Sequence, residues 1–134
     1  MVDIFFDTTF ADFFVLIDKV RTQQILINLI SNAIKFSHAG DRIKVEVLHE
    51  GPRSRDDPSL AFKFIVTDKG LGLNDLDRKN LFQPNFRSSD KANRACNANS
   101  NGLGLYTCKR LAQVLNGDLK LAEEYRQGCK FVFE

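Results

Sequence analysis

The sequence predicts an α+β fold, a two-layer α/β sandwich in which a sheet of about five strands carries about three helices on one face. Five short stretches alternate apolar and polar residues with a period of two, which is typical of strands with one buried face. Two longer stretches repeat apolar residues at helical spacing, and a third, shorter one begins with a helix-capping residue. Because the helical stretches fall between pairs of strands, we expect the helices to share one face of the sheet.

The expected strands share a simple pattern, with aliphatic or Phe residues at every second position and polar residues between them. They cover residues 2–6, 43–47, 62–66, 119–121 and 131–133.

The first expected helix covers residues 19–36, where apolar residues from Val20 to Ile34 recur on one side. The second covers residues 103–115 and stops at Asn116-Gly117, a pair that commonly ends helices. A shorter helix is expected over residues 74–81, with Asn74 as its N-cap.

Two polar stretches predict exposed loops, because neither has the apolar residues needed to bury a face. Residues 49–59 contain Pro52, Pro58 and several charges. Residues 87–101 are rich in Asn and Ser, and a loop of that length inside a compact domain is commonly a lid or a binding loop.

Composition limits the classes of function. The chain has 134 residues, which is enough for one domain with a real core. A net charge of +2 gives no support for a nucleic-acid partner, and no apolar run is long enough to cross a membrane. Three widely spaced cysteines form neither a disulfide framework nor a zinc pattern, so a reduced, cytoplasmic setting is expected.

The first candidate site is a polar stripe on the helix at residues 19–36. Asn28, Asn32 and Lys35 fall within a narrow arc, opposite the apolar positions. A solvated face would give the same pattern. However, Asn is a poor helix former, so two of them one turn apart in mid-helix also fit a face that contacts a ligand.

The second candidate site is the sequence VTDKGLGL, which follows an expected buried strand. Gly70 and Gly72 remove side chains where a ligand could lie against the backbone, and Asp68 could accept a hydrogen bond from an amino group. A tight turn that ends the strand is the simpler alternative.

The third candidate is NGLGLYTCKRLA, where a polar loop becomes a helix. Gly102 and Gly104 would leave backbone N–H groups exposed at the positive end of the helix dipole, which favours an anion. A flexible hinge with a helix cap is the alternative interpretation.

Taken together and in this order, the three features resemble the N, G1 and G2 boxes of the GHKL ATPase superfamily. The greatest similarity is to the catalytic, ATP-binding domain of sensor histidine kinases. The sequence RTQQILINLISNAIKFS resembles the N box, LFQPNFRSS resembles the F box, and GDLKLAEEYRQGCKFVF resembles the closing hairpin. The resemblance covers nearly all of residues 1–134. It implies a mixed sheet, with ATP bound between the helices and residues 87–101 as the ATP lid.

The resemblance also implies roles for individual residues. Asn32 would coordinate Mg²⁺ through its amide oxygen, Asn28 would reach the same region, and Lys35 would neutralise phosphate charge. Asp68 would accept a hydrogen bond from the adenine amino group, which favours ATP over GTP. The implied catalytic residues are Asn28, Asn32 and Lys35, and the implied ATP site is Asn28, Asn32, Lys35, Asp68, Gly70, Gly72, Phe82, Phe86, Arg87, Gly102, Leu103, Gly104 and Leu105.

Asn28 separates the subclasses of the superfamily. Gyrase- and MutL-like members carry Glu there to activate water, whereas an amide cannot act as a general base at neutral pH. The resemblance therefore implies slow hydrolysis and transfer of the γ-phosphoryl group of Mg-ATP to a histidine, in two-component signal transduction. The alternatives are a non-catalytic nucleotide-binding regulatory module and a GHKL kinase that acts on a residue other than His.

The expected partners follow from the same resemblance. His38 and His49 are typical of surface histidines, so the acceptor histidine is expected on a separate dimerisation and helical-hairpin domain of the same or a partner chain. A response regulator would act downstream, and the isolated domain is expected to be monomeric. The domain is expected to be cytoplasmic, and the whole protein could be a membrane-anchored sensor.

This sequence departs from the family pattern at three places. Ser100 stands where the G2 box has its first Gly, and Asn85 is an extra residue in the F box. The family's first helix, before the opening strand, is absent from residues 1–134, as is the phospho-acceptor hairpin.

Overall fold

A computed structural model describes residues 3–8, 16–52, 60–96 and 102–134. Position 2 of the first expected strand and Ser100 lie outside these ranges, as does the last part of the expected lid. The strands are β1 (Asp3–Thr8), β2 (Arg42–Pro52), β3 (Leu60–Thr67), β4 (Leu119–Leu121) and β5 (Lys130–Phe133). The helices are α1 (Lys19–Phe36), α2 (Asp75–Asn80), α3 (Lys91–Cys96) and α4 (Gly104–Val114).

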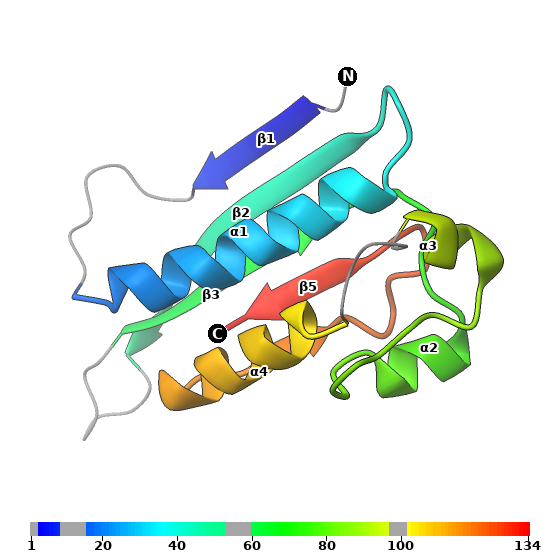
Figure 1. Cartoon of the computed structure of the whole chain (residues 1–134). Coiled ribbons are helices and arrows are strands. Elements are labelled where there is room, and N and C mark those ends of the chain that lie inside the picture. The colour runs from blue at the N-terminus through cyan, green and yellow to red at the C-terminus, as the bar shows by residue number, and fades with distance from the viewer. Residues whose placement is uncertain (1–2, 9–15, 53–59, 97–101) are drawn as a thin grey trace.

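The strands form a single five-stranded sheet in the order β1-β2-β3-β5-β4. β1 pairs with β2 in parallel, and the remaining pairs are antiparallel. Helix α1 packs on β2 and β3, α4 packs on β4, and the two helices contact each other, so they cover one face of the sheet (Figure 1). The expected two-layer fold with a mixed sheet is therefore confirmed.

Helix α1 has the bounds that the sequence predicts. It begins after Asp18, whose Oδ1 accepts a hydrogen bond from the backbone N–H of Arg21 at 2.9 Å. Its buried residues recur every three or four positions, as one face of a helix requires, and are Thr22, Ile25, Leu29 and Ala33. This spacing turns the opposite side of the helix, with its polar residues, away from the sheet.

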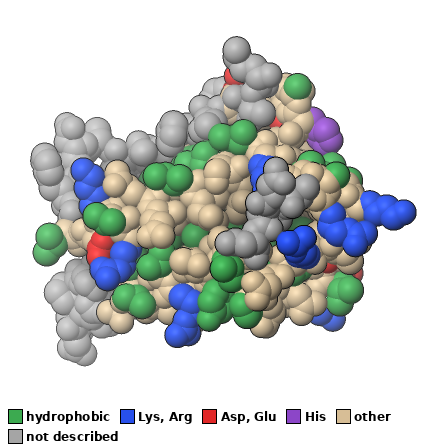
Figure 2. Space-filling view, viewed as in Figure 1, with side chains coloured by type: hydrophobic (Ala, Val, Ile, Leu, Met, Phe, Trp, Pro, Cys, Tyr) green, Lys and Arg blue, Asp and Glu red, His purple; other side chains and the backbone are tan. Residues whose placement is uncertain are grey.

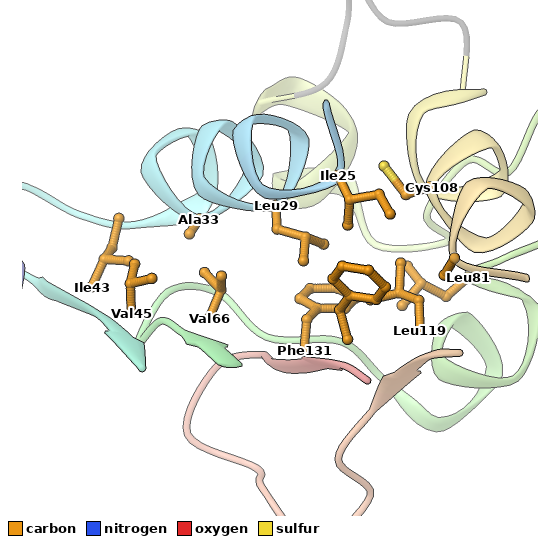
Figure 3. Close-up of a cluster of buried hydrophobic side chains, with 12 residues drawn as sticks. Ile25, Leu29, Ala33, Ile43, Val45, Val66, Leu81, Cys108, Leu119 and Phe131 are labelled. Atoms are coloured by element: carbon orange, nitrogen blue, oxygen red, sulfur yellow. The ribbon is translucent and has the colours of Figure 1, made fainter. Parts of the chain in front are cut away.

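The hydrophobic core lies between α1 and the sheet. Leu29 and Ala33 point down from α1 toward Val66 of β3 and Phe131 of β5 (Figure 3). Cys108 adds the contribution of α4 to the same cluster. This close packing fixes the position of α1 relative to β3 and β5.

The two other expected helices also form. Asn74 caps α2, because its Oδ1 accepts a hydrogen bond from the backbone N–H of Asp77 at 2.8 Å. Helix α4 ends next to Asn116, which takes a left-handed φ of 59°, and the N–H of Gly117 then bonds to the carbonyl of Ala112 at 3.0 Å.

Both expected loops need correction. Residues 49–52 belong to β2, because the strand continues past a bulge between Glu50 and Pro52. The expected lid contains helix α3, and two of its polar residues, Ser88 and Asn93, are buried. Within the described ranges, no helix is both long and apolar enough to cross a membrane.

Candidate functional site

A hollow of about 240 Å³ lies where α1, the start of α4, the turn after β3 and the expected lid meet. Most of the residues predicted for the site lie in its wall, although they are far apart in the sequence. They are Asn28, Asn32, Lys35, Asp68, Gly72, Phe86, Gly102, Gly104 and Leu105.

Helix α1 supplies the amide side of the hollow. Asn28 and Asn32 lie one turn apart, and Asn32 donates a hydrogen bond from Nδ2 to Oδ1 of Asn28 at 3.2 Å. This bond leaves Oδ1 of Asn32 without a hydrogen-bond partner among the described residues, in the wall of the hollow. The pair therefore presents an amide oxygen from Asn32 and an amide N–H₂ from Asn28 to a ligand.

Asp68 lies at the end of β3 and is 4% exposed. Its Oδ1 accepts hydrogen bonds from the backbone N–H groups of Gly70 at 2.9 Å and Cys129 at 3.1 Å. Burial raises the pKa of this carboxyl above its ordinary value, against the opposing effect of those two N–H groups. Among the described residues Oδ2 has no hydrogen-bond partner, so it is the atom that a ligand can use.

The β3–β5 pairing fixes the position of Asp68. Its backbone N–H donates to the carbonyl of Cys129 at 2.9 Å, and the Tyr125 hydroxyl donates to the Asp68 carbonyl at 3.0 Å. Burial, followed by the nearby Asp68 carboxylate, raises the pKa of the Cys129 thiol to about 12, so this side chain is neutral. The carboxylate is therefore held in place by the backbone around it, beside a thiol that carries no charge.

The start of α4 closes the hollow opposite Asp68. Leu103, the N-cap residue, makes no side-chain capping bond, and the first turn has no acidic residue. Gly104 lies so close to α1 that a Cβ there would come within 2.7 Å of Asn28 Nδ2. The first N–H groups of α4 and the amides of α1 thus form one polar corner that suits an anion.

Four predicted residues do not line the hollow. Gly70 packs against the end of α1, where a Cβ would overlap the carbonyl oxygen of Phe36. Phe82 turns toward the core and meets Phe131 edge-on, with 6.4 Å between the ring centroids. Arg87 and Leu103 are exposed. Their roles at the site stay predictions.

The wall also contains residues that were not predicted as site residues. Leu81 and Phe131 belong to the core cluster and reach the hollow from its base. Ser88 and Asn93 lie inside the range predicted as the lid, where the sequence pointed only to the range itself. The full set is Phe36, Leu73, Leu81, Ser88, Asn93, Cys129 and Phe131.

Positive charge lies beside the hollow. Lys35 is part of its wall, and Arg87, Lys91 and Arg94 are exposed in the described part of the expected lid. Figure 2 shows Lys and Arg side chains gathered at the end of the molecule where Figure 1 places α3. This distribution favours an anionic ligand at that end.

The donor set fits a hard cation that is held mainly by a ligand. Within the described ranges, no group of three or more His, Cys, Asp or Glu side chains could hold a metal ion. The amide oxygen of Asn32 is a suitable single protein ligand for Mg²⁺, which keeps waters and bridges phosphates. A magnesium ion would therefore reach this site together with a phosphorylated compound.

Several curated proteins are similar in sequence. The chain is 36% identical over 115 residues to the autoinducer 2 sensor kinase/phosphatase LuxQ of Vibrio cholerae, covering 85% of this chain and 12% of the relative. It is 33% identical over 133 residues to histidine kinase 5 of Arabidopsis thaliana, covering 87% and 14%. It is 32% identical over 116 residues to the histidine-protein kinase BarA of Escherichia coli, covering 87% and 12%. The chain thus spans less than a sixth of the length of these relatives.

Solved structures share the fold. The catalytic domain of histidine kinase ThkA superposes with a TM-score of 0.74 at 24% identity, covering 98% of this chain and 76% of that one. ShkA, solved full-length in complex with AMPPNP, gives a TM-score of 0.73 at 24% identity and covers 98% and 25%.

The family model described as histidine kinase-, DNA gyrase B- and HSP90-like ATPase matches residues 17–134. This range contains every residue in the wall of the hollow. The chain therefore belongs to this ATPase family, and the curated relatives to which it is similar are named as sensor or histidine kinases.

Proposed function

We propose that this domain binds Mg-ATP in the hollow and transfers its γ-phosphoryl group to a histidine on a separate helical-hairpin domain. The observation that carries the proposal is that Oδ2 of Asp68 and the amides of Asn28 and Asn32 belong to one hollow. A carboxylate suits the adenine amino group, and amides beside a helix N-terminus suit a magnesium-bridged triphosphate. A single bound nucleotide, with its adenine at Asp68 and its triphosphate at the two amides, would use both parts of the hollow.

Asp68 would select the base. Its Oδ1 is taken by two backbone N–H groups, so the remaining oxygen can accept from the exocyclic amine of adenine. Guanine presents a carbonyl oxygen at that position, which a carboxylate would repel. Gly72 would let the base lie against the backbone, and the apolar floor formed with Phe131 and Leu81 would cover its face.

Asn32, Lys35 and the start of α4 would hold the phosphates. The magnesium ion, bound to Asn32 and the phosphate oxygens, would neutralise charge on the group that is transferred. Lys35 and the N–H groups near Gly104 would add further positive potential. Phe86, Gly102 and Leu105 would complete the wall around the triphosphate.

The transfer step requires no base from this domain. A neutral imidazole nitrogen of the acceptor attacks the γ-phosphorus as the bond to the β–γ bridging oxygen breaks, and ADP leaves. Asn28 cannot deprotonate water at neutral pH, which preserves ATP for this transfer. The acceptor domain and a downstream response regulator complete the proposed two-component pathway.

Calorimetry tests the binding part of the proposal. Mg-ATP is titrated into the wild type, into Asp68→Asn and into Asp75→Asn, which removes an exposed carboxylate from α2 as a charge-matched control. Loss of a buried polar pairing predicts a drop in affinity of about tenfold or more for Asp68→Asn. The Asp75 variant should bind like the wild type, and equal binding by all three proteins would contradict the proposal.

A transfer assay separates phosphotransfer from binding alone. The domain is mixed with radiolabelled Mg-ATP and a separately made acceptor hairpin. Label that is labile to acid and stable to alkali indicates phosphohistidine and supports the proposal. Binding without transfer would favour a regulatory nucleotide-binding module, and acid-stable label would favour transfer to a residue other than His.

A further inference from the structure

Helix α2 carries a buried carboxylate that the proposed function does not use. Asp77 is 2% exposed, and a charged side chain at that depth needs close partners. The Ser88 hydroxyl donates to Oδ2, and the backbone N–H and hydroxyl of Ser89 both donate to Oδ1 at 2.9 Å. Among the described residues, the hydrogen-bond donors to this carboxylate are thus Ser88 and Ser89, at the start of the expected lid. We call Asp77, Ser88 and Ser89 the lid clasp.

Further hydrogen bonds join the lid clasp to the start of α2 and to the next residue of the lid. On α2, Asn74 accepts from the backbone N–H of Asp77 and donates to the Ser89 hydroxyl at 2.8 Å. On the lid, the N–H of Asp90 donates to the Ser88 hydroxyl at 3.1 Å. These bonds fix the direction in which the chain leaves Phe86 and enters α3.

Helix α3 then contacts the turn after β3. Asp90 caps α3 by accepting from the backbone N–H groups of Ala92 and Asn93. Asn93, which is 5% exposed, donates from Nδ2 to the carbonyl of Gly72 at 3.0 Å. The lid clasp therefore stands at the beginning of a series of hydrogen bonds that ends at Gly72, in the turn after β3.

From this arrangement we infer that Asp77 is a positioning residue for the nucleotide. It holds residues 87–96 against α2, so that Ser88 and Asn93 form part of the wall of the hollow. The inference rests on the proposed function, because the wall matters only if the hollow binds a nucleotide. Asp77 itself does not line the hollow and acts through the lid.

The charge of Asp77 matches this role. Burial raises its pKa, but the hydrogen bonds from Ser88 and Ser89 outweigh that effect and hold the pKa below its ordinary value. The carboxylate is therefore ionised at neutral pH, and hydrogen bonds to an ionised acceptor are the stronger kind. An amide at this position would turn an N–H₂ group toward one of the serine donors.

The test compares Asp77→Asn with Asp75→Asn in the whole chain. Asp75 lies on the same helix, but it is exposed and pairs with Arg126 at 2.6 Å. We expect Asp77→Asn to weaken Mg-ATP binding roughly tenfold by calorimetry, and Asp75→Asn to leave it unchanged. Hydrogen exchange should speed up in residues 87–96 of the Asp77 variant and stay unchanged in α1 and β3. If the substitution destabilised the whole domain, hydrogen exchange would instead speed up in residues 87–96, in α1 and in β3 alike.

A second pair of variants keeps the test decisive if Asp77→Asn fails to fold. The double variant Ser88→Ala/Ser89→Ala removes the two hydroxyl donors, keeps the backbone N–H of residue 89 and the carboxylate, and should also weaken Mg-ATP binding. If the Asp77 variant and the double serine variant both fold, the variant that combines all three substitutions should lose little more affinity for Mg-ATP than either of them alone. If the wild type binds Mg-ATP and all variants of the lid clasp bind it equally well, the inference is overturned. If the wild type does not bind Mg-ATP, the proposed function is overturned instead.

Discussion

Two aspartates near the hollow are both almost fully buried, yet their surroundings shift their pKa values in opposite directions. Asp68 receives backbone N–H groups on one oxygen, and burial dominates, so its pKa is raised. Asp77 receives hydroxyl and N–H donors on both oxygens, and its pKa is lowered. The carboxyl with an unused oxygen is the one that we propose for the ligand, and the fully bonded one is the one that we propose to position the lid.

The raised pKa of Asp68 predicts how Asp68→Asn affects stability. A carboxyl that is harder to ionise in the folded state costs stability above its unfolded pKa, near 4. The variant keeps an oxygen that can accept from Gly70 and Cys129. We expect its thermal midpoint at pH 7 to equal or exceed that of the wild type, and the difference to shrink as the pH falls to 4. Circular dichroism at both values measures this, and a midpoint several degrees lower at pH 7 would contradict it.

Asp77 predicts the opposite pH dependence. Its lowered pKa adds stability above the unfolded pKa, and that stability is lost as the pH falls through the folded value. Asp77→Asn should therefore cost about 1–3 kcal/mol at pH 7 and progressively less as the pH falls below about 4, the unfolded pKa. Urea unfolding across this range measures the effect. A cost that does not change with pH would show that the charge of Asp77 does not matter.

Among the elements, α1 is the one that its sequence predicts most completely. Apolar residues at helical spacing and the preceding Asp18 define both its buried face and its start. The lid is harder to predict, because α3 has only six residues and little apolar surface. Its position depends on hydrogen bonds to Asp77 and Gly72, which come from elements distant in the sequence.

Two glycines at the joints between elements predict contrasting effects when changed to alanine. At Gly70 a Cβ would overlap backbone atoms of Phe36, which cannot move without shifting α1. At Gly104 it would meet the end of the Asn28 side chain at 2.7 Å, which can rotate away. Gly70→Ala should therefore lose about 1–3 kcal/mol of stability. Gly104→Ala should stay folded and lose Mg-ATP affinity, because Asn28 leaves its position.

Chemical denaturation and calorimetry on both variants check this contrast. We expect Gly70→Ala to lose more free energy of unfolding than Gly104→Ala. We expect Gly104→Ala to lose more affinity for Mg-ATP than its own loss of stability would explain. The reverse pattern would mean that the turn after β3 can shift to make room for a side chain at residue 70. It would also mean that the contact between α1 and α4 at Gly104 cannot shift in the same way.

At the scale of the whole molecule, the arrangement of layers was predictable because alternation and helical spacing are local signals. The resemblance implied a mixed sheet, but neither the parallel direction of β1 nor the strand order β1-β2-β3-β5-β4 was predicted, because local patterns do not specify which strands pair. For the candidate site, residue type and spacing singled out Asn28, Asn32 and Asp68, and the structure brings these three into the wall of one hollow. Residue type and spacing could not show that Gly70 packs on Phe36 or that Phe82 faces Phe131, because those contacts arise from tertiary packing. The extra Asn85 is accommodated by a left-handed φ of 58°.

The hollow draws its wall from α1, the end of β3, the lid and α4, so a ligand bound there links all the layers of the domain. Binding to the folded state alone stabilises it by about 2.7 kcal/mol when the free ligand is at 100 times its Kd. For a chain of 134 residues this corresponds to a rise of roughly 10 °C in the thermal midpoint.

We therefore expect Mg-ATP to raise the midpoint of the wild type in a single transition, because α1 and the sheet share one core. ATP with a chelator should raise it less, since Asn32 would then have no cation to bind. Asp68→Asn should lose most of the shift at the same ATP concentration. Differential scanning calorimetry measures all three, and a transition that splits in two with ATP would mean that the hollow stabilises only part of the domain.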